Sequence, residues 1–126
     1  MRFVVYSGTA EIESVKTELL TAGLYVEGWC AEQVFRRRWT GYRVVKIAVA
    51  YNRRNTPVAW SMIVDTGYPP VSLWAYTTPR YRHKGLGKSL VAMLGGTKGK
   101  CTDRSLPYQE YFWEKCDGLT TVESMV

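Results

Sequence analysis

One short stretch of the chain combines basic side chains with two glycines just before an apolar helical pattern: Arg82-His83-Lys84-Gly85-Leu86-Gly87-Lys88. Glycine has no Cβ atom, so a ligand can approach the backbone closely at Gly85 and Gly87. The first N–H groups of a helix have no partner within the helix and carry partial positive charge, which attracts anions. The spacing Arg82-x-x-Gly85-x-Gly87 therefore indicates a site for a phosphate or pyrophosphate group.

This stretch departs from the two commonest phosphate-binding motifs. It lacks the Gly-x-Gly-x-x-Gly of dinucleotide-binding folds and the Gly-x-x-x-x-Gly-Lys-Ser/Thr of the P-loop. Taken alone, the same residues also fit an ordinary basic turn before a helix. The elements on either side must therefore decide between the two interpretations.

The elements predicted on either side would hold the stretch at the end of a strand. Residues 71–77 are rich in β-formers and end before Pro79, which indicates a strand. On the other side, apolar residues recur at helical spacing from Leu86 to Leu94, and Gly95 follows. The sequence therefore predicts a strand that leads into a basic, glycine-bearing loop and then into a helix.

Upstream of this unit, runs of β-branched and aromatic residues indicate further strands, and apolar residues at helical spacing indicate helices. The predicted elements are a strand over 2–6, a helix over 10–22, an ambiguous second helix within 24–40, and strands over 42–51 and 57–64. The turn-like residues between the last two strands favour an antiparallel hairpin. We expect Arg36-Arg37-Arg38 in the last turn of the second helix, where cations suit the helix dipole.

Downstream of Gly95, the sequence signals for helices and strands are weaker. Residues 106–116 mix aromatic and helical character, and residues 119–126 carry β-branched residues that suggest a last short strand. The whole order has three successive strands before the main helix. This order is typical of an α+β, mixed fold rather than of a regularly alternating doubly wound one. We expect one domain over residues 1–126.

The 126 residues carry a net charge of +6, and this charge is unevenly spread. Residues 33–104 hold fourteen Lys and Arg against two acidic residues, whereas residues 1–32 and 105–126 are each net −3. A basic middle indicates an anionic ligand, either nucleic acid or a phosphorylated cofactor. A solvated basic surface would give the same pattern.

Composition argues against several other classes. No stretch has the ~20 apolar residues of a membrane-spanning helix, and residues 1–7 are too short and too polar for a signal peptide. Cys30, Cys101 and Cys116 lack the spacing of zinc ligands. An odd number of thiols suggests a reducing compartment. We therefore expect a cytoplasmic protein without a metal site.

Residues 73–90 as a whole resemble the acyl-CoA-binding signature of the GNAT N-acetyltransferase superfamily. In that family a strand leads into a Pro-x-Tyr-Arg segment, and an Arg/Gln-x-x-Gly-x-Gly/Ala loop and the cofactor helix follow. The residues that match in register are Pro79, Tyr81, Arg82, Gly85, Gly87 and Leu90. The order of the preceding elements is also the family's. The resemblance implies a GNAT-like fold, with a central, mostly antiparallel sheet flanked by helices.

The resemblance also implies a site for acetyl-CoA. The backbone near Tyr76 and Thr77 would pair with the pantetheine arm as an added strand would, and the following loop would hold the pyrophosphate. Ser89 would add a hydroxyl group. The implied cofactor-binding residues are Tyr76, Thr77, Arg82, His83, Lys84, Gly85, Leu86, Gly87, Lys88 and Ser89.

The family's reaction is direct attack of a neutral primary amine on the acetyl thioester, without an acyl-enzyme intermediate. A family tyrosine that protonates the departing thiolate lies in a segment similar to residues 111–119, but the register puts Trp113 there, and an indole cannot act as the acid. Tyr111 or Tyr108 is therefore the candidate catalytic acid, with aromatic packing as the alternative role. No general base stands out, because Asp65 is interpreted as a turn residue and His83 lies in the expected phosphate loop.

The acceptor amine is less defined. The basic charge disfavours polycationic acceptors and favours a protein lysine, an N-terminus or aminoacyl-tRNA, with possible nucleic-acid contact. Only 31 residues follow Gly95, fewer than the family's usual closing elements need, so we expect that a second copy of the chain completes the site in a homodimer.

Two other functions fit the same sequence. A nucleic-acid-binding surface would use basic residues interleaved with aromatic ones, namely Arg36, Arg37, Arg38, Arg43, Arg53 and Arg54 with Trp39, Tyr42 and Tyr51. A CoA-binding regulator without catalysis would explain why the acid and the base are hard to identify.

Overall fold

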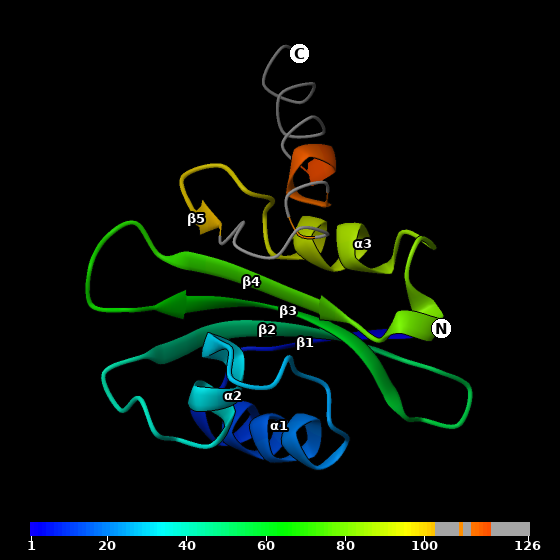
Figure 1. Ribbon diagram of the computed structural model, residues 1–126, viewed down its shortest axis with the longest axis horizontal. Helices are drawn as coiled ribbons and strands as arrows, with labels where there is room; N and C mark the ends of the chain where they lie inside the picture. The colour runs from blue at the N-terminus through cyan, green and yellow to red at the C-terminus, as the bar shows by residue number, and fades with distance from the viewer. Residues whose placement is uncertain (103–108, 110–111, 117–126) are drawn as a thin grey trace.

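The computed structural model describes residues 1–102, 109 and 112–116, and its centre is a five-stranded sheet in the order β1-β2-β3-β4-β5 (Figure 1). The pairs β1–β2, β2–β3 and β3–β4 are antiparallel, and β5 pairs with β4 in parallel. The elements are β1 (Arg2–Tyr6), α1 (Thr9–Thr21), α2 (Cys30–Phe35), β2 (Arg43–Tyr51), β3 (Pro57–Asp65), β4 (Ser72–Thr77), a 3-10 helix η1 (Pro79–Tyr81), α3 (Leu86–Met93) and β5 (Cys101–Thr102).

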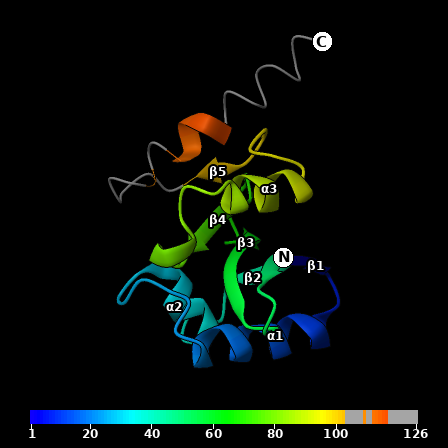
Figure 2. The same ribbon diagram turned by 90° about the vertical axis from the view of Figure 1, so that its right-hand side faces the viewer.

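Helices cover both faces of the sheet, so the molecule has three layers (Figure 2). α1 and α2 lie on one face, and α3 and a helical segment at 112–116 lie on the other. Successive side chains of a strand point to opposite faces, and β4 divides its residues in this way. Trp74 packs in the core under α1 and α2, whereas Leu73 and Ala75 pack in the core under α3.

The fold class predicted from the sequence is confirmed, because the sheet is mostly antiparallel and is flanked by helices. The predicted strands agree with β1 to β4 to within a residue or two, and the β2–β3 hairpin forms as expected. β5, with two residues, was not predicted. The strand expected over 119–126 lies outside the described residues.

The predicted position of the three consecutive arginines was wrong. α2 ends at Phe35, so Arg36 to Arg38 follow the helix instead of forming its last turn. Arg37 adopts a left-handed backbone conformation with φ of 59°, which is incompatible with a continuing α-helix. The chain therefore leaves the helix at this point and runs towards β2.

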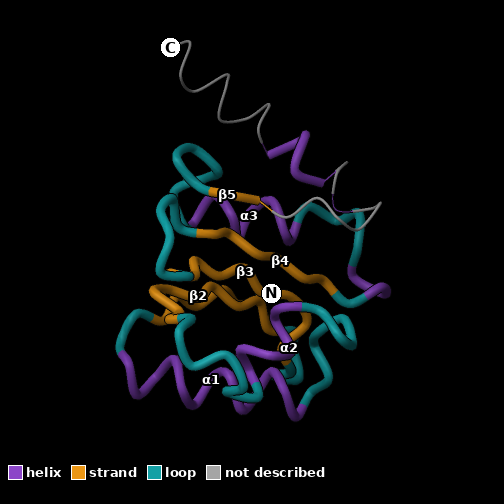
Figure 3. Tube along the Cα trace, turned by 60° about the vertical axis from the view of Figure 1, so that its left-hand side comes forward, coloured by secondary structure: helices purple, strands orange, loops and turns teal. Residues whose placement is uncertain are grey.

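β4 keeps a strand partner on one side along its length but on the other side only at its start. β3 pairs with β4 from Ser72 to Thr77, whereas β5 pairs with Ser72 and Leu73 alone. Beyond Leu73, the β5 side of β4 has no strand neighbour among the residues that the structure describes (Figure 3). This open edge leads directly into the glycine-bearing loop. Within the described ranges, no helix is long and apolar enough to span a membrane.

Candidate functional site

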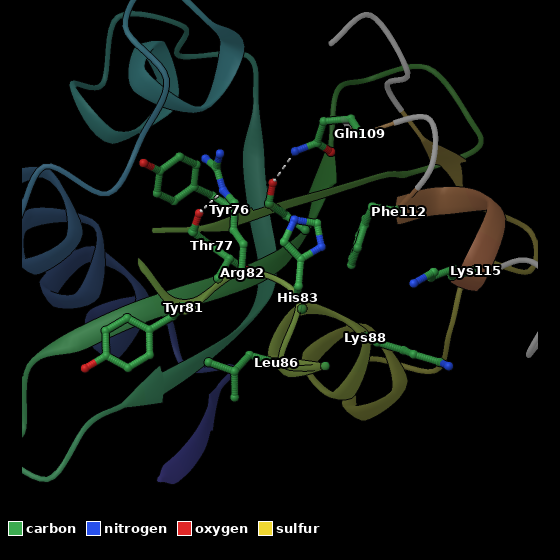
Figure 4. A pocket seen from close by; sticks show the side chains of 13 residues that line it. Tyr76, Thr77, Tyr81, Arg82, His83, Leu86, Lys88, Gln109, Phe112 and Lys115 are labelled. Atoms are coloured by element: carbon green, nitrogen blue, oxygen red, sulfur yellow. Dashed lines mark hydrogen bonds between the residues drawn. The ribbon is translucent and has the colours of Figure 1, made fainter. Parts of the chain in front are cut away.

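A pocket of about 360 Å³ lies between the end of β4, the loop before α3 and the helical segment at 112–116 (Figure 4). Eight of the ten predicted cofactor-binding residues line it: Tyr76, Thr77, Arg82, His83, Gly85, Leu86, Gly87 and Lys88. The other two, Lys84 and Ser89, do not line it. The structure thus brings the strand end and the loop together around one cavity.

The loop backbone has the shape of an anion-binding turn. The angle φ is positive at His83 (63°) and at Gly85 (77°) but not at Lys84 between them. Such alternation turns successive N–H groups towards the same side. The N–H of Ser89 donates to the carbonyl of Gly85 (3.1 Å), and the N–H groups of residues 86–88 donate no backbone hydrogen bond within the described chain. These N–H groups are therefore not used by the backbone of the described chain.

Glycine is favoured at the two motif positions for different structural reasons. A Cβ atom on Gly85 would meet nothing within 4 Å, so glycine is favoured there by its left-handed backbone and leaves the loop open to a ligand. A Cβ atom on Gly87 would lie 2.8 Å from Cε1 of Phe112 and 3.5 Å from Oγ1 of Thr77. Gly87 therefore allows α3 to pack closely against Phe112, a packing role that the motif did not predict.

The carbonyls on the open edge of β4 are already occupied by side chains. The carbonyl of Val71 faces β5, because it accepts from the N–H of Cys101 (2.9 Å), and alternation puts Ala75 and Thr77 on the same edge. The carbonyl of Ala75 accepts from Nε2 of Gln109 (3.1 Å), and that of Thr77 accepts from Nε of Arg82 (2.9 Å), as Figure 4 shows. Among the described residues, no strand pairs with the N–H groups of Ala75 and Thr77 on this edge.

Arg82 turns back onto β4 rather than away from it. Its guanidinium carbon lies 5.8 Å from the ring centroid of Tyr76, in addition to its bond with Thr77. Lys84 folds in a similar way, with Nζ 5.5 Å from the ring centroid of Tyr81. Arg82 thus fixes the start of the loop on the strand.

Five residues that line the pocket were not among the predicted cofactor-binding residues: Tyr81, which the motif contains, and Ala75, Gln109, Phe112 and Lys115. Gln109 is the most informative of them, because it is only 4% exposed and its Oε1 has no hydrogen-bond partner in the described structure. A buried acceptor without a partner costs about 1–3 kcal/mol. Nothing in the sequence distinguished Gln109, because a single polar residue in a mixed segment has no periodic signal.

The predicted catalytic acids cannot be placed against the pocket, since Tyr108 and Tyr111 lie outside the described residues. Trp113, which occupies the expected register of the acid, is fully buried and packs against Phe112 with ring centroids 4.7 Å apart. It is therefore a core residue. Asp65 is a turn residue, as expected: its Oδ1 accepts from the N–H of Gly67 (2.9 Å).

Three residues of the predicted nucleic-acid surface have partners within the protein instead. Arg36 pairs with Glu32 of α2 (2.8 Å), and Arg37 pairs with Glu13 of α1 (2.8 Å), so both arginines already have acidic partners within the chain. The prediction that Tyr51 forms a stacking platform was wrong. Tyr51 is 2% exposed, its hydroxyl lies 2.8 Å from that of Tyr6, and burial raises its pKa.

Comparisons with known proteins bear on the fold. No protein-family model matches the sequence, and no curated protein matches it significantly. A ribosomal-protein-alanine N-acetyltransferase from Brucella melitensis biovar Abortus 2308 superposes with a TM-score of 0.50 and 12% identity, covering 91% of this chain and 90% of that chain. A glucosamine-6-phosphate N-acetyltransferase from Arabidopsis thaliana gives a TM-score of 0.46 and 20% identity, with 93% and 91% covered. The first of these likenesses shows a shared fold.

Proposed function

We propose that this chain, whose fold is that of the GNAT N-acetyltransferases, binds acetyl-CoA in the pocket beside β4 and transfers the acetyl group to a primary amine. One observation carries the proposal. The open edge of β4 leads directly into a loop whose left-handed residues and helix start present N–H donors to the same pocket. An extended amide chain and a pyrophosphate need these two features side by side.

The residues of the pocket fit the parts of acetyl-CoA. Residues 83–88 would hold the pyrophosphate, with Lys88 adding positive charge. The N–H groups of Ala75 and Thr77 would pair with carbonyl groups of the pantetheine arm, in the manner of an added strand. Oε1 of Gln109 is an unused acceptor in the same wall, and it suits an amide N–H of that arm.

The proposed reaction forms an amide bond and breaks a thioester. The nitrogen of a neutral amine attacks the acetyl carbon and loses a proton to water as the amide forms. The carbon–sulfur bond breaks, and CoA leaves as the thiol after gaining a proton. Backbone N–H groups of β4 would stabilise the negative charge that develops on the carbonyl oxygen. Tyr111 or Tyr108 stays the proposed proton donor.

The acceptor that we favour is an amine on a macromolecule, such as a protein lysine, an N-terminus or aminoacyl-tRNA. The net charge of +6 disfavours encounter with free polycations. We propose a cytoplasmic enzyme in which a second copy of the chain adds to the acceptor side. Binding to nucleic acid without catalysis, and binding of CoA without catalysis, are the alternative functions that the first experiment must separate.

The test is titration calorimetry of the protein with acetyl-CoA, with ATP and a generic DNA duplex as comparison ligands. We expect micromolar binding of acetyl-CoA that is lost in Gly85→Leu, because the new side chain would cover the phosphate-binding backbone. Gly23→Leu is the matched control, since Gly23 has a similar φ of 72° and open space around it but lies after α1.

Two results would contradict the proposal. Normal acetyl-CoA binding by a folded Gly85→Leu protein would remove the loop from the site. Absence of acetyl-CoA binding, together with tight and salt-sensitive DNA binding, would replace the enzyme by a nucleic-acid-binding protein. If acetyl-CoA binds, a screen of amines with detection of free CoA thiol separates the transferase from the regulator.

A further inference from the structure

A second recess, here called the hairpin recess, lies beside the turn between β2 and β3. It has a volume of about 410 Å³ and is lined by Met1, Asn52, Arg53, Arg54, Arg80 and Tyr81. Three of these six residues are arginines, and they come from two separate elements, the hairpin turn and η1. Tyr81 also lines the pocket of the proposed acetyl-CoA site, so the two cavities adjoin.

The backbone that carries the arginines is held by hydrogen bonds. Oδ1 of Asn52 accepts from the N–H groups of Arg54 (2.9 Å) and Thr56 (3.0 Å), which fixes the hairpin turn. On the other side, the N–H of Thr78 donates to the carbonyl of Val58 (3.0 Å), and this bond ties the start of η1 to β3. These bonds fix the backbone from which the three exposed arginine side chains extend.

Within the part of the chain that the structure describes, no acidic side chain neutralises this cluster. Arg53, Arg54 and Arg80 form no ion pair with any described residue. Asp65 is the only acidic residue between positions 33 and 102, and it lies at the far end of the sheet, opposite Arg43. Guanidinium groups match phosphate oxygens in charge and in geometry. The hairpin recess therefore suits a phosphate group.

We propose that the hairpin recess binds the 3′-phosphate of CoA, an inference that rests on the proposed function. CoA carries this phosphate monoester on its ribose, apart from the pyrophosphate, and such a group has a charge of about −1.5 to −2 at pH 7. The recess adjoins the pyrophosphate loop through Tyr81, as a phosphate on the same ligand requires. A nucleic-acid strand is disfavoured, because Arg36 and Arg37, two of the basic residues predicted for such a surface, are paired with acidic residues.

The test compares CoA with dephospho-CoA, two ligands that differ only in the 3′-phosphate. We expect the wild-type protein to bind CoA about tenfold more tightly by calorimetry, the size of one charge-assisted contact. The double variant Arg53→Gln/Arg54→Gln should lose this preference while its affinity for dephospho-CoA stays unchanged. Arg43→Gln/Lys98→Gln removes the same charge at the other end of the sheet and should keep the preference.

Each outcome bears on a defined part of the proposal. Equal binding of CoA and dephospho-CoA by the wild-type protein would overturn the assignment of the recess and leave the proposed function intact. A preference that survives in Arg53→Gln/Arg54→Gln would place the 3′-phosphate elsewhere. Equal binding combined with an oligonucleotide affinity that this variant loses would assign the recess to nucleic acid instead. Failure of both CoA forms to bind would remove the proposed function as well.

Discussion

Gly87 shows how one missing methyl group sets the contact between a helix and an aromatic side chain. Its ideal Cβ position lies 2.8 Å from Cε1 of Phe112, and both residues line the pocket. Any side chain at this position would push Phe112 away from α3. The close approach of these two residues gives a direct test of the packing around the site.

We predict that Gly87→Ala lowers the free energy of unfolding by about 1–3 kcal/mol, the usual cost of overpacking. Urea unfolding followed by tryptophan fluorescence measures the change. Phe112→Leu in the same chain shortens the clashing ring and should restore part of the loss. Equal losses in the single and the double variant would show that the clash with Phe112 is not the cause.

Gln109 leads to a different expectation, because its amide is only half satisfied. Its Nε2 donates to the carbonyl of Ala75, but its Oε1 has no partner in the described structure. Gln109→Leu removes one unpaired acceptor and creates another. We predict a change of less than about 1 kcal/mol in the free energy of unfolding of the ligand-free protein, measured in urea. A loss several times larger would mean that the side-chain amide is fully bonded.

At the residue level, the sequence predicted the loop better than the rest of the pocket. Gly85 and His83 could be assigned because glycines and basic residues before a helix have a clear physical meaning. The pocket wall opposite the loop could not, because Gln109 and Phe112 reach it from a segment more than twenty positions away along the chain. Such a contact depends on tertiary packing, which no local pattern encodes.

At the scale of elements, Glu32 links the residues just before α2 to the residue just after it. Its carboxylate accepts from the N–H of Gly28 (2.8 Å) and from Nε of Arg36 (2.8 Å). The bond from Gly28, followed by that from Arg36, lowers the pKa of Glu32 below its ordinary value of 4.5. This carboxylate thus favours the folded state only while it is ionised.

The pH dependence of stability follows from this lowered pKa. Because the pKa of Glu32 is lower in the folded state, its stabilising contribution is present above pH 4.5 and is lost as the pH falls through the folded-state pKa. We predict that the midpoint of thermal unfolding decreases on acidification below this pH, and that Glu32→Gln shows a smaller decrease. Part of the decrease should remain in Glu32→Gln, because the pKa of Glu13 is also lowered, chiefly by its hydrogen bond with Lys16. Identical acid dependence in wild-type and Glu32→Gln protein would contradict the prediction.

Elements with many local signals were predictable, and elements defined by their partners were not. The β2–β3 hairpin has two long runs of β-formers around a turn, so its strands were placed to within a residue or two. α2 is only six residues long, and the left-handed conformation of Arg37 ends it earlier than its composition suggested. β5 consists of Cys101 and Thr102 and is a strand only because β4 lies beside it.

At the scale of the whole molecule, the charge is organised around the proposed site. The basic middle of the chain supplies the loop and the hairpin recess, while arginines near α2 are neutralised by acidic partners. A field of this kind raises the association rate of an anionic ligand and is screened by salt.

We therefore predict that the association rate constant for CoA falls as ionic strength rises from about 0.05 to 0.5 M, while the dissociation rate changes less. Stopped-flow fluorescence, using the aromatic residues near the pocket, can separate the two rates. An association rate that does not respond to salt would show that the basic middle plays no part in the encounter.

The side-chain caps on β4 also bear on how the chain behaves at high concentration. An exposed strand edge is a template on which another chain can add a strand and begin an aggregate. Such an incoming strand needs carbonyl acceptors as well as donors, and on this edge Gln109 and Arg82 already occupy the carbonyls of Ala75 and Thr77. The edge is thus a poor template for a foreign backbone. We therefore expect that concentrated protein does not aggregate by adding strands to this edge of β4.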